Sequence, residues 1–230
     1  MKRTVLITGA SGNLGAGVMQ KFLEEDFQIA ALDSPRSAPG IKESAQVRSF
    51  PADLMDERGV GEVVEAVYSI FGSIEMAVLT VGGFAMGDIE KTGLDDFDKM
   101  YRLNFVTAYN VARQLYLRMR DQDGGGLIVF IGSRPALHPD QAKNMIAYSL
   151  TKSLVFRLSE VINEEGKEVN VGASVVIPSV IDTPQNRTAM PDADFSKWVS
   201  PLQIAEKIHH LTTTSGRKQR ESIIEIYGDS

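Results

Sequence analysis

Tyr148 and Lys152 are a pair of side chains whose types and spacing could do chemistry. They lie four residues apart in an apolar pattern of helical spacing, so a helix would place them as neighbours on one face. A phenol, with an ordinary pKa of about 10, can give or take a proton, and an ammonium beside it favours the phenolate. The pair could therefore act in general acid–base catalysis. The same pattern also fits an ordinary amphipathic helix with its lysine in solvent, so other motifs must decide.

A glycine-rich stretch, Thr8-Gly9-Ala10-Ser11-Gly12-Asn13-Leu14-Gly15, lies between the first apolar run and the first helical pattern. Glycines there let the backbone turn sharply and approach a pyrophosphate. The helix that follows would point its free amides and the positive end of its dipole at that anion. The alternative is a tight turn that binds no ligand. The glycine-rich stretch lies between the first strand and the first helix of a chain in which strands and helices alternate, and this position favours the phosphate site.

Asp33 ends the second apolar run, eighteen residues after Gly15. A carboxylate near that spacing can accept hydrogen bonds from an adenosine ribose, and it would repel a 2′-phosphate. Asp33 could instead cap the bend at Ser34-Pro35, and Arg36 could receive a 2′-phosphate. We expect NAD(H) to be preferred, with NADP(H) as the alternative cofactor.

Short apolar runs alternate with longer helical patterns along the whole chain. Strands are expected at 4–7, 28–32, 47–50, 76–79, 127–131, 169–177 and 223–227. Helices are expected at 14–25, 60–71, 95–120, 144–164 and 201–211, with irregular chain over 178–199. Continuous apolar strands separated by helices indicate parallel pairing with helices on both faces. The sequence predicts an α/β protein whose residues 1–230 form a single Rossmann-type, doubly wound domain with a parallel sheet of about seven strands.

Composition narrows the classes of partner. The net charge of -6 argues against nucleic acid or an anionic membrane as the main partner. The absence of cysteine excludes disulfides and thiolate metal sites and agrees with a reducing compartment. No apolar run approaches the roughly 20 residues of a membrane span. We expect a soluble, cytoplasmic protein that binds a small-molecule substrate and no metal.

These residues, in this order, resemble the short-chain dehydrogenase/reductase family from Thr4 to Tyr227. The resemblance implies that Tyr148 is the general acid in reduction, or the general base in oxidation. It implies that Lys152 tunes the phenol and holds the nicotinamide ribose. Ser133, after the fifth strand, would orient a carbonyl, and Asn104, in the long helix, would hold a water that links Lys152 to solvent. Taken singly, Ser133 could cap a turn and Asn104 could satisfy backbone inside a helix.

The resemblance also implies a set of cofactor contacts, most of which follow the ends of parallel strands. Asp53 could face the adenine edge or simply sit in a turn. Thr183 resembles the family threonine that meets the nicotinamide amide, and it could equally be a helix cap. The full set is Gly9, Ser11, Gly12, Asn13, Leu14, Gly15, Asp33, Asp53, Leu54, Gly82, Tyr148, Lys152, Pro178, Ile181 and Thr183.

Departures from the common family pattern point to one branch. Asn13 stands where the commoner loop has glycine, the asparagine-rich motif after the fourth strand is replaced over 79–83, and Ser179 replaces a glycine. The segments 78–84 and 181–187 resemble dihydropteridine reductase, which reduces quinonoid dihydropterins with NADH and generally lacks the serine. The loop 182–199 is predicted to be a substrate lid. Its Phe195 and Trp198 could stack on a flat substrate or anchor the lid to the core.

Three hypotheses for function follow. The first is an NAD(H)-dependent oxidoreductase acting on a carbonyl or alcohol, which Ser133 favours. The second is a pterin reductase, and the third is a dinucleotide-binding sensor without turnover. The loops 84–93, 134–143 and 182–199 that would shape the substrate site carry no transferable code, so the substrate stays open.

A homodimer or homotetramer is expected, because the helices 95–120 and 144–164 carry apolar residues on more than one face. A single face of the sheet cannot bury them all, and the family commonly pairs these helices between subunits. The residues concerned are Leu103, Phe105, Val106, Leu115, Leu117, Leu154, Val155 and Leu158.

Overall fold

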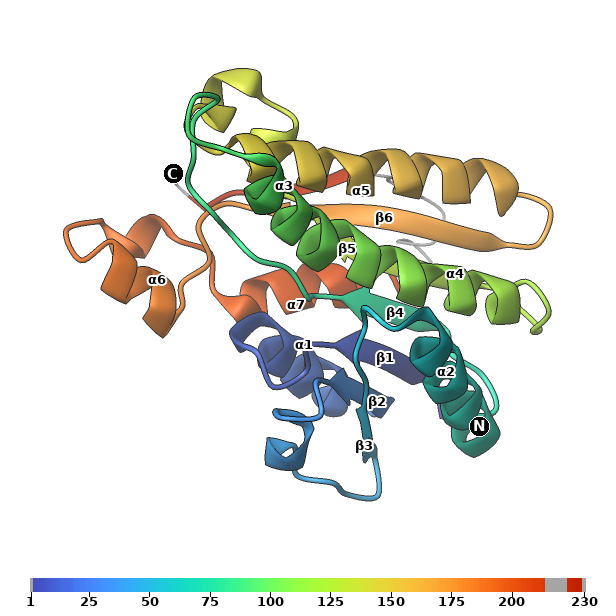
Figure 1. Cartoon of the computed structure of the whole chain (residues 1–230). Coiled ribbons are helices and arrows are strands. Elements are labelled where there is room, and N and C mark those ends of the chain that lie inside the picture. The colour runs from blue at the N-terminus through green and yellow to red at the C-terminus, as the bar shows by residue number, and fades with distance from the viewer. Residues whose placement is uncertain (1, 214–222, 229–230) are drawn as a thin grey trace.

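A seven-stranded parallel sheet forms the centre of the computed structural model, which describes residues 2–213 and 223–228 (Figure 1). Its strands run in the order β3-β2-β1-β4-β5-β6-β7. The predicted fold class is confirmed, and each predicted strand lies within two residues of an observed one. The strands are β1 (Thr4–Thr8), β2 (Gln28–Asp33), β3 (Val47–Pro51), β4 (Met76–Leu79), β5 (Gly126–Ile131), β6 (Val171–Pro178) and β7 (Ile223–Ile226).

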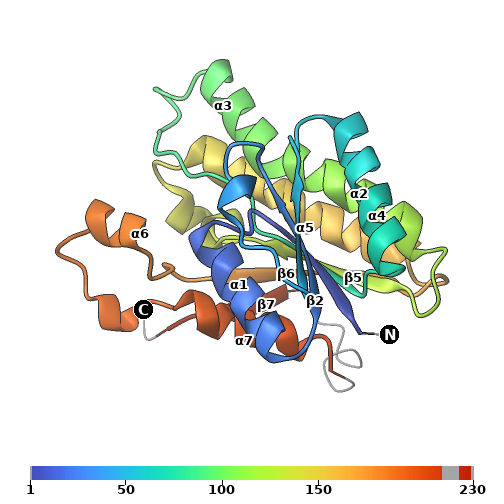
Figure 2. The ribbon, with the colours of Figure 1, turned by 90° about the horizontal axis from the view of Figure 1, so that it is seen from below.

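Helices cover both faces of the sheet. On one face, α1 (Asn13–Glu24) packs beside α7 (Pro201–His210), as Figure 2 shows from below. The other face carries α2 (Glu57–Phe71), α4 (Thr107–Met119) and α5 (Ile146–Glu165). The inner strands are largely apolar because each face of the sheet buries its own hydrophobic core, whereas the edge strands β3 and β7 carry exposed residues. β1 illustrates this, since all five of its residues are buried.

The contact between α1 and α7 is close because Gly17 has no side chain. A Cβ atom at Gly17 would lie 2.7 Å from the Cβ atom of Pro201, the first residue of α7. Ser200 caps α7, with its hydroxyl accepting from the amide of Gln203 at 3.2 Å. This packing fixes α1, whose first turn forms the end of the glycine-rich stretch.

Two predictions of helical structure need correction. The predicted helix 95–120 is α3 (Leu94–Tyr101) followed by α4, joined by a π-helical turn at Arg102–Val106. The segment 178–199 is not irregular throughout, because it contains α6 (Pro184–Ala189) and a 3-10 turn at Phe195–Lys197. The helix α6 and the 3-10 turn are too short to show a 3.6-residue period in the sequence.

The strand order reverses at β1, which lies between β2 and β4. In open parallel sheets, ligands bind in the crevice outside the carboxyl ends of the strands at such a switch point. The chain after β1, β4, β5 and β6 therefore meets at one edge. None of the described helices is both long enough and apolar enough to cross a membrane.

Candidate active site

Lys152 lies on the second turn of α5 and is turned into the protein. Its Nζ atom donates to the carbonyl oxygen of Ile131, the last residue of β5, at 2.8 Å. Only 7% of the residue is exposed, so the interpretation of a lysine in solvent is wrong. Burial disfavours the charged form and lowers the pKa of Lys152 to about 8.

Asn104 sits in the π-helical turn and is also buried. Its Oδ1 atom accepts from the amide of Gly83 at 2.8 Å, and its Nδ2 atom donates to Oγ1 of Thr151 at 3.3 Å. A Cβ atom at Gly82 would lie 2.9 Å from Asn104 Oδ1 and 3.1 Å from Lys152 Nζ. The chain after β4, the π-helical turn and α5 therefore converge on Gly82, where a side chain would displace them.

Ser133 follows β5 in extended backbone, and its hydroxyl makes no cap hydrogen bond. The Oγ atom is buried and has no hydrogen-bond partner among the residues that the structure describes. It nevertheless lies close to the phenol of Tyr148 on the first turn of α5. Burial raises the pKa of Tyr148, and the neighbouring Ser133 hydroxyl partly offsets that rise. The expected tuning of this pKa by the ammonium of Lys152 stays a prediction, and in this structure that ammonium binds the carbonyl of Ile131.

The glycine-rich stretch forms the tight turn that the sequence predicts. Gly9 has a φ of 63°, in the left-handed region, and its carbonyl accepts from the amide of Gly12 at 2.9 Å. A Cβ atom at Gly15 would lie 2.1 Å from that carbonyl, so α1 can approach the turn only with glycine there. No side chain caps α1 and no acidic residue lies in its first turn. The first amides, which include those of Asn13 and Leu14, therefore suit an anion such as a pyrophosphate.

Asp33 is buried at the end of β2 and holds the glycine-rich turn against that strand. Its Oδ2 atom accepts from the amide of Ser11, and its Oδ1 atom accepts from the amide of Ser34, both at 2.8 Å. The capping role that the sequence left open is therefore present. A carboxylate has about four acceptor sites, so Asp33 keeps acceptors for a ligand. Arg36 is exposed in the same connection.

Asp53 and Leu54 follow β3 at the same edge. Asp53 is exposed, and its Oδ1 atom accepts from the amide of Met55 at 3.0 Å within its own turn. Leu54 is buried, and its carbonyl accepts from the side chain of Asn110 at 3.0 Å. Strand β3 is the outermost strand on this side of the sheet. Strand β2 therefore lies between these two residues and the turn at 9–12, which follows β1.

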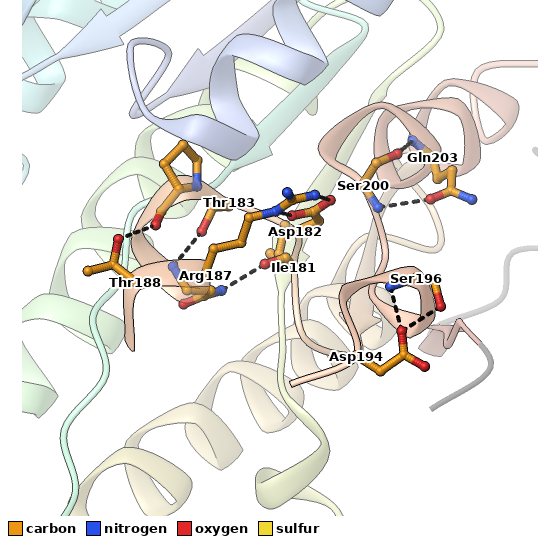
Figure 3. A network of polar contacts seen from close by, with 11 residues as sticks. Ile181, Asp182, Thr183, Arg187, Thr188, Asp194, Ser196, Ser200 and Gln203 are labelled. Atoms are coloured by element: carbon orange, nitrogen blue, oxygen red, sulfur yellow. Dashed lines mark hydrogen bonds and ion pairs between the residues drawn. The ribbon is translucent and has the colours of Figure 1, made fainter. Parts of the chain in front are cut away.

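The segment after β6 folds back on itself (Figure 3). Pro178 ends β6, and Ile181 forms a parallel bridge with Val199. Thr183 caps α6, because its hydroxyl accepts from the amide of Asn186 at 3.1 Å.

An ion pair joins α6 to the residue Asp182 that precedes it. Arg187 binds Asp182 through two contacts of 2.6 Å and 2.8 Å, visible in Figure 3. The guanidinium also lies over the ring of Phe195, 4.8 Å from its centroid. Phe195 in turn packs on Trp198, with ring centroids 4.7 Å apart. Trp198 is buried, which favours the anchor over the substrate stack.

Comparison with known proteins decides the family. A family model described as short chain dehydrogenase matches residues 3–194. The chain belongs to the short-chain dehydrogenase family. The prediction of an oxidoreductase of this family is therefore confirmed.

Several relatives and solved structures are similar to this short-chain dehydrogenase over most of its length. A dihydropteridine reductase of Dictyostelium discoideum is 27% identical over 221 residues, covering 94% of this chain and 90% of its own. A 7alpha-hydroxysteroid dehydrogenase of Bacteroides fragilis is 26% identical over 191 residues, covering 79% and 73%. The structure of ElxO with NADP bound has a TM-score of 0.87 at 23% identity, covering 98% and 97%. A Brucella melitensis 3-ketoacyl-(acyl-carrier-protein) reductase complexed with NADH has a TM-score of 0.84 at 20% identity, covering 97% and 96%.

The structure adds contacts that sequence reasoning missed in this short-chain dehydrogenase. Thr151 is fully buried and bridges Asn104 to α5, and the carbonyl of Ile131 receives Lys152. Thr80 fixes the glycine-rich turn, with its hydroxyl donating to the carbonyl of Thr8 at 2.7 Å. No sequence signal marks the carbonyl, because any residue type supplies one. The position of Thr151 inside the Tyr148–Lys152 motif could have drawn attention to it.

Lys152 is predicted to titrate with a midpoint near pH 8, because burial makes its ammonium release a proton more readily. The measurement is a magnetic resonance titration of isotope-labelled lysine side chains, with the signal assigned by its loss in Lys152→Met. A midpoint near the ordinary value of about 10.4 would mean that water reaches this ammonium and would contradict the buried site.

Proposed function

We propose that this short-chain dehydrogenase reduces a carbonyl, or oxidises the corresponding alcohol, with NAD(H). The observation that carries the proposal is the Ser133 hydroxyl, buried beside Tyr148 with no hydrogen-bond partner in the described part of the chain. The phenol of Tyr148 interacts with this hydroxyl but does not reach the geometry of a regular hydrogen bond. A substrate oxygen in front of Ser133 would accept that hydrogen bond.

Tyr148 is the proton donor in this proposal. Its raised pKa keeps the phenol protonated at neutral pH, which suits the direction of carbonyl reduction. As negative charge grows on the substrate oxygen, Ser133 stabilises it with a hydrogen bond and Tyr148 delivers a proton to the same atom. The nicotinamide supplies the hydride when it is bound. Asn104 is a positioning residue, because its hydrogen bonds hold Gly83 and Thr151 in place around Lys152.

The same crevice supplies groups suited to hold a nicotinamide dinucleotide. The turn at 9–12 and the start of α1 offer backbone amides for the pyrophosphate, and Asp33 offers carboxylate oxygens for the adenosine ribose. Gly82 leaves room beside Lys152. In this proposal the remaining contacts come from Ser11, Asp53, Leu54, Pro178, Ile181 and Thr183, and the segment 182–199 acts as the lid.

NADH is predicted to bind more tightly than NADPH, because the Asp33 carboxylate would repel a 2′-phosphate. Calorimetric titration of both cofactors measures the preference. The Asp33→Ser variant should narrow the gap between them. Comparable or tighter NADPH binding by the wild type, lost in Arg36→Ala, would mean that Arg36 sets the preference.

A quinonoid dihydropterin is the second candidate substrate. It is favoured by the similarity to the Dictyostelium dihydropteridine reductase, which spans 94% of this chain. Reduction of that substrate spreads charge over several atoms of a conjugated ring, so a single serine donor should matter less. The two candidates therefore differ in how strongly they depend on Ser133.

Two variants test the proposal, with Tyr116→Phe on α4 as a matched control. Tyr148→Phe should lower kcat about 10²–10⁴-fold, because general acid catalysis is lost, and should leave NADH binding in place. Ser133→Ala should lower kcat for the best carbonyl substrate about 10²–10³-fold, because one oxyanion donor is lost. Steady-state rates for a carbonyl panel and for a quinonoid dihydropterin measure both effects.

Two outcomes would contradict the carbonyl proposal. Strong pterin turnover, little changed in Ser133→Ala and accompanied by no carbonyl turnover, would establish the pterin reductase. No turnover of either substrate class would favour the dinucleotide-binding sensor.

A homodimer or homotetramer is the proposed state of this chain, which we place in the cytoplasm. Leu115 and Val155 do not support the assembly, because both are buried inside the chain. The support comes from Tyr109 on α4 and from Leu150 and Val161 on α5, which are large and exposed. Residues eleven positions apart lie on one face of a helix, so Leu150 and Val161 form one apolar face.

Light scattering at micromolar protein is predicted to give the mass of a dimer or tetramer. Leu150→Asp should shift that mass towards the monomer, because a carboxylate cannot be buried in an apolar contact without cost. Ile70→Asp on α2 is the matched control, since Ile70 is equally exposed. A monomeric wild type would contradict the proposed assembly.

A further inference from the structure

The connection between β4 and α3 displays an unusual apolar surface. Phe84, Met86, Ile89 and Leu94 are 58%, 65%, 74% and 86% exposed. They are the four most exposed large apolar side chains in the described part of the chain, and they lie within eleven consecutive residues. We refer to residues 84–94 as the apolar loop. Soluble proteins rarely leave such a patch in water unless it binds something.

The apolar loop has a defined shape. The amide of Thr92 donates to the carbonyl of Asp88 at 3.0 Å, which closes a turn with Ile89 inside it. Gly87 packs against that turn so closely that a Cβ atom there would lie 2.5 Å from Thr92 Oγ1. Ile89 is thus presented by a turn whose backbone is hydrogen-bonded within itself.

The apolar loop is fixed to the start of the helix that carries Tyr148. The amide of Gly87 donates to the carbonyl of Asn144 at 2.7 Å, and the amide of Ile146 donates to the carbonyl of Gly87 at 3.0 Å. The ring of Phe84 meets the ring of Tyr148 edge-on, with centroids 5.0 Å apart. The apolar surface is therefore continuous with the proposed proton donor.

A cavity opens beneath the loop. Its walls are mixed, and Ala85, Met86, Met100 and Ala147 supply the apolar part. Lys91, Lys99, Thr92 and Asp96 add polar groups to the lining. Ala147 belongs to the first turn of α5, so this cavity reaches the helix that carries Tyr148.

We propose that the apolar loop binds an apolar portion of the substrate, several carbons long, attached to the carbonyl that Tyr148 and Ser133 reduce. The inference rests on the proposed function and narrows it to apolar carbonyl compounds. A small polyol or a polar heterocycle would leave Met86, Ile89 and Leu94 in water. A second copy of this chain is the competing occupant, but the contact between Phe84 and Tyr148 favours the substrate.

A chain-length series tests this inference in turnover. With NADH, the wild type should have a kcat/KM for 2-nonanone at least tenfold higher than its kcat/KM for 2-butanone. The reason is that burying one methylene fully should raise kcat/KM roughly fourfold. The double variant Ile89→Ser/Leu94→Ser should lower that ratio about tenfold. Ile70→Ser, which removes an equally apolar exposed side chain from α2, should leave the ratio unchanged.

A binding experiment separates this inference from the proposed function, because it needs no reaction. Octanamide, which hydride cannot reduce under these conditions, should bind the NADH complex at least tenfold more tightly than butanamide by calorimetry, and the double variant should lose most of that difference. If no ketone is reduced but this difference holds, the carbonyl chemistry is wrong and the apolar site stands.

Equal binding of both amides would overturn the site. A fall in solution mass in the double variant, with the chain-length ratio retained, would overturn it in favour of a second copy.

Discussion

The buried ammonium of Lys152 is the constraint on which the rest of the site depends. A lysine can be taken out of water only if its donors find acceptors, and here the carbonyl of Ile131 at the end of β5 is one of them. This contact fixes the distance between α5 and the edge of the sheet. The π-helical turn then brings Asn104 to the same place, where it binds the backbone of Gly83. A side chain at Gly82 would displace these two groups, because its Cβ atom would lie 2.9 Å from Asn104 Oδ1 and 3.1 Å from Lys152 Nζ.

Burial raises the pKa of Tyr148 and lowers the pKa of Lys152. It favours the neutral form of each, so the phenol of Tyr148 keeps its proton while the ammonium of Lys152 releases its proton more easily. The result is a site that holds a proton on the residue facing the buried hydroxyl of Ser133. That distribution suits proton delivery to an oxygen, which is the chemistry that a carbonyl reductase requires.

The two segments proposed to flank the substrate differ in character. The lid at 182–199 is tied together by polar contacts, with Arg187 bound to Asp182 and stacked on Phe195. The apolar loop at 84–94 presents its large side chains to water instead. The polar side chains of the lid thus bind one another, whereas the large apolar side chains of the apolar loop are free to contact a ligand. The apolar loop therefore has the free apolar surface that the proposed substrate contact needs.

The sequence by itself determined the fold class, because alternating apolar strands and helices can bury their faces only as a parallel sheet covered on both sides. It also identified the glycine-rich turn and the order of Asn104, Ser133, Tyr148 and Lys152. The tertiary structure decided what periodicity cannot express. A π-helical turn has the same composition as an α-helix, and a six-residue helix such as α6 is shorter than two turns. The direction of the Lys152 side chain, the unpaired state of Ser133 and the exposure of the apolar loop depend on neighbours far away in the chain. A local pattern of residues holds no information about which distant carbonyl, helix or solvent each side chain meets.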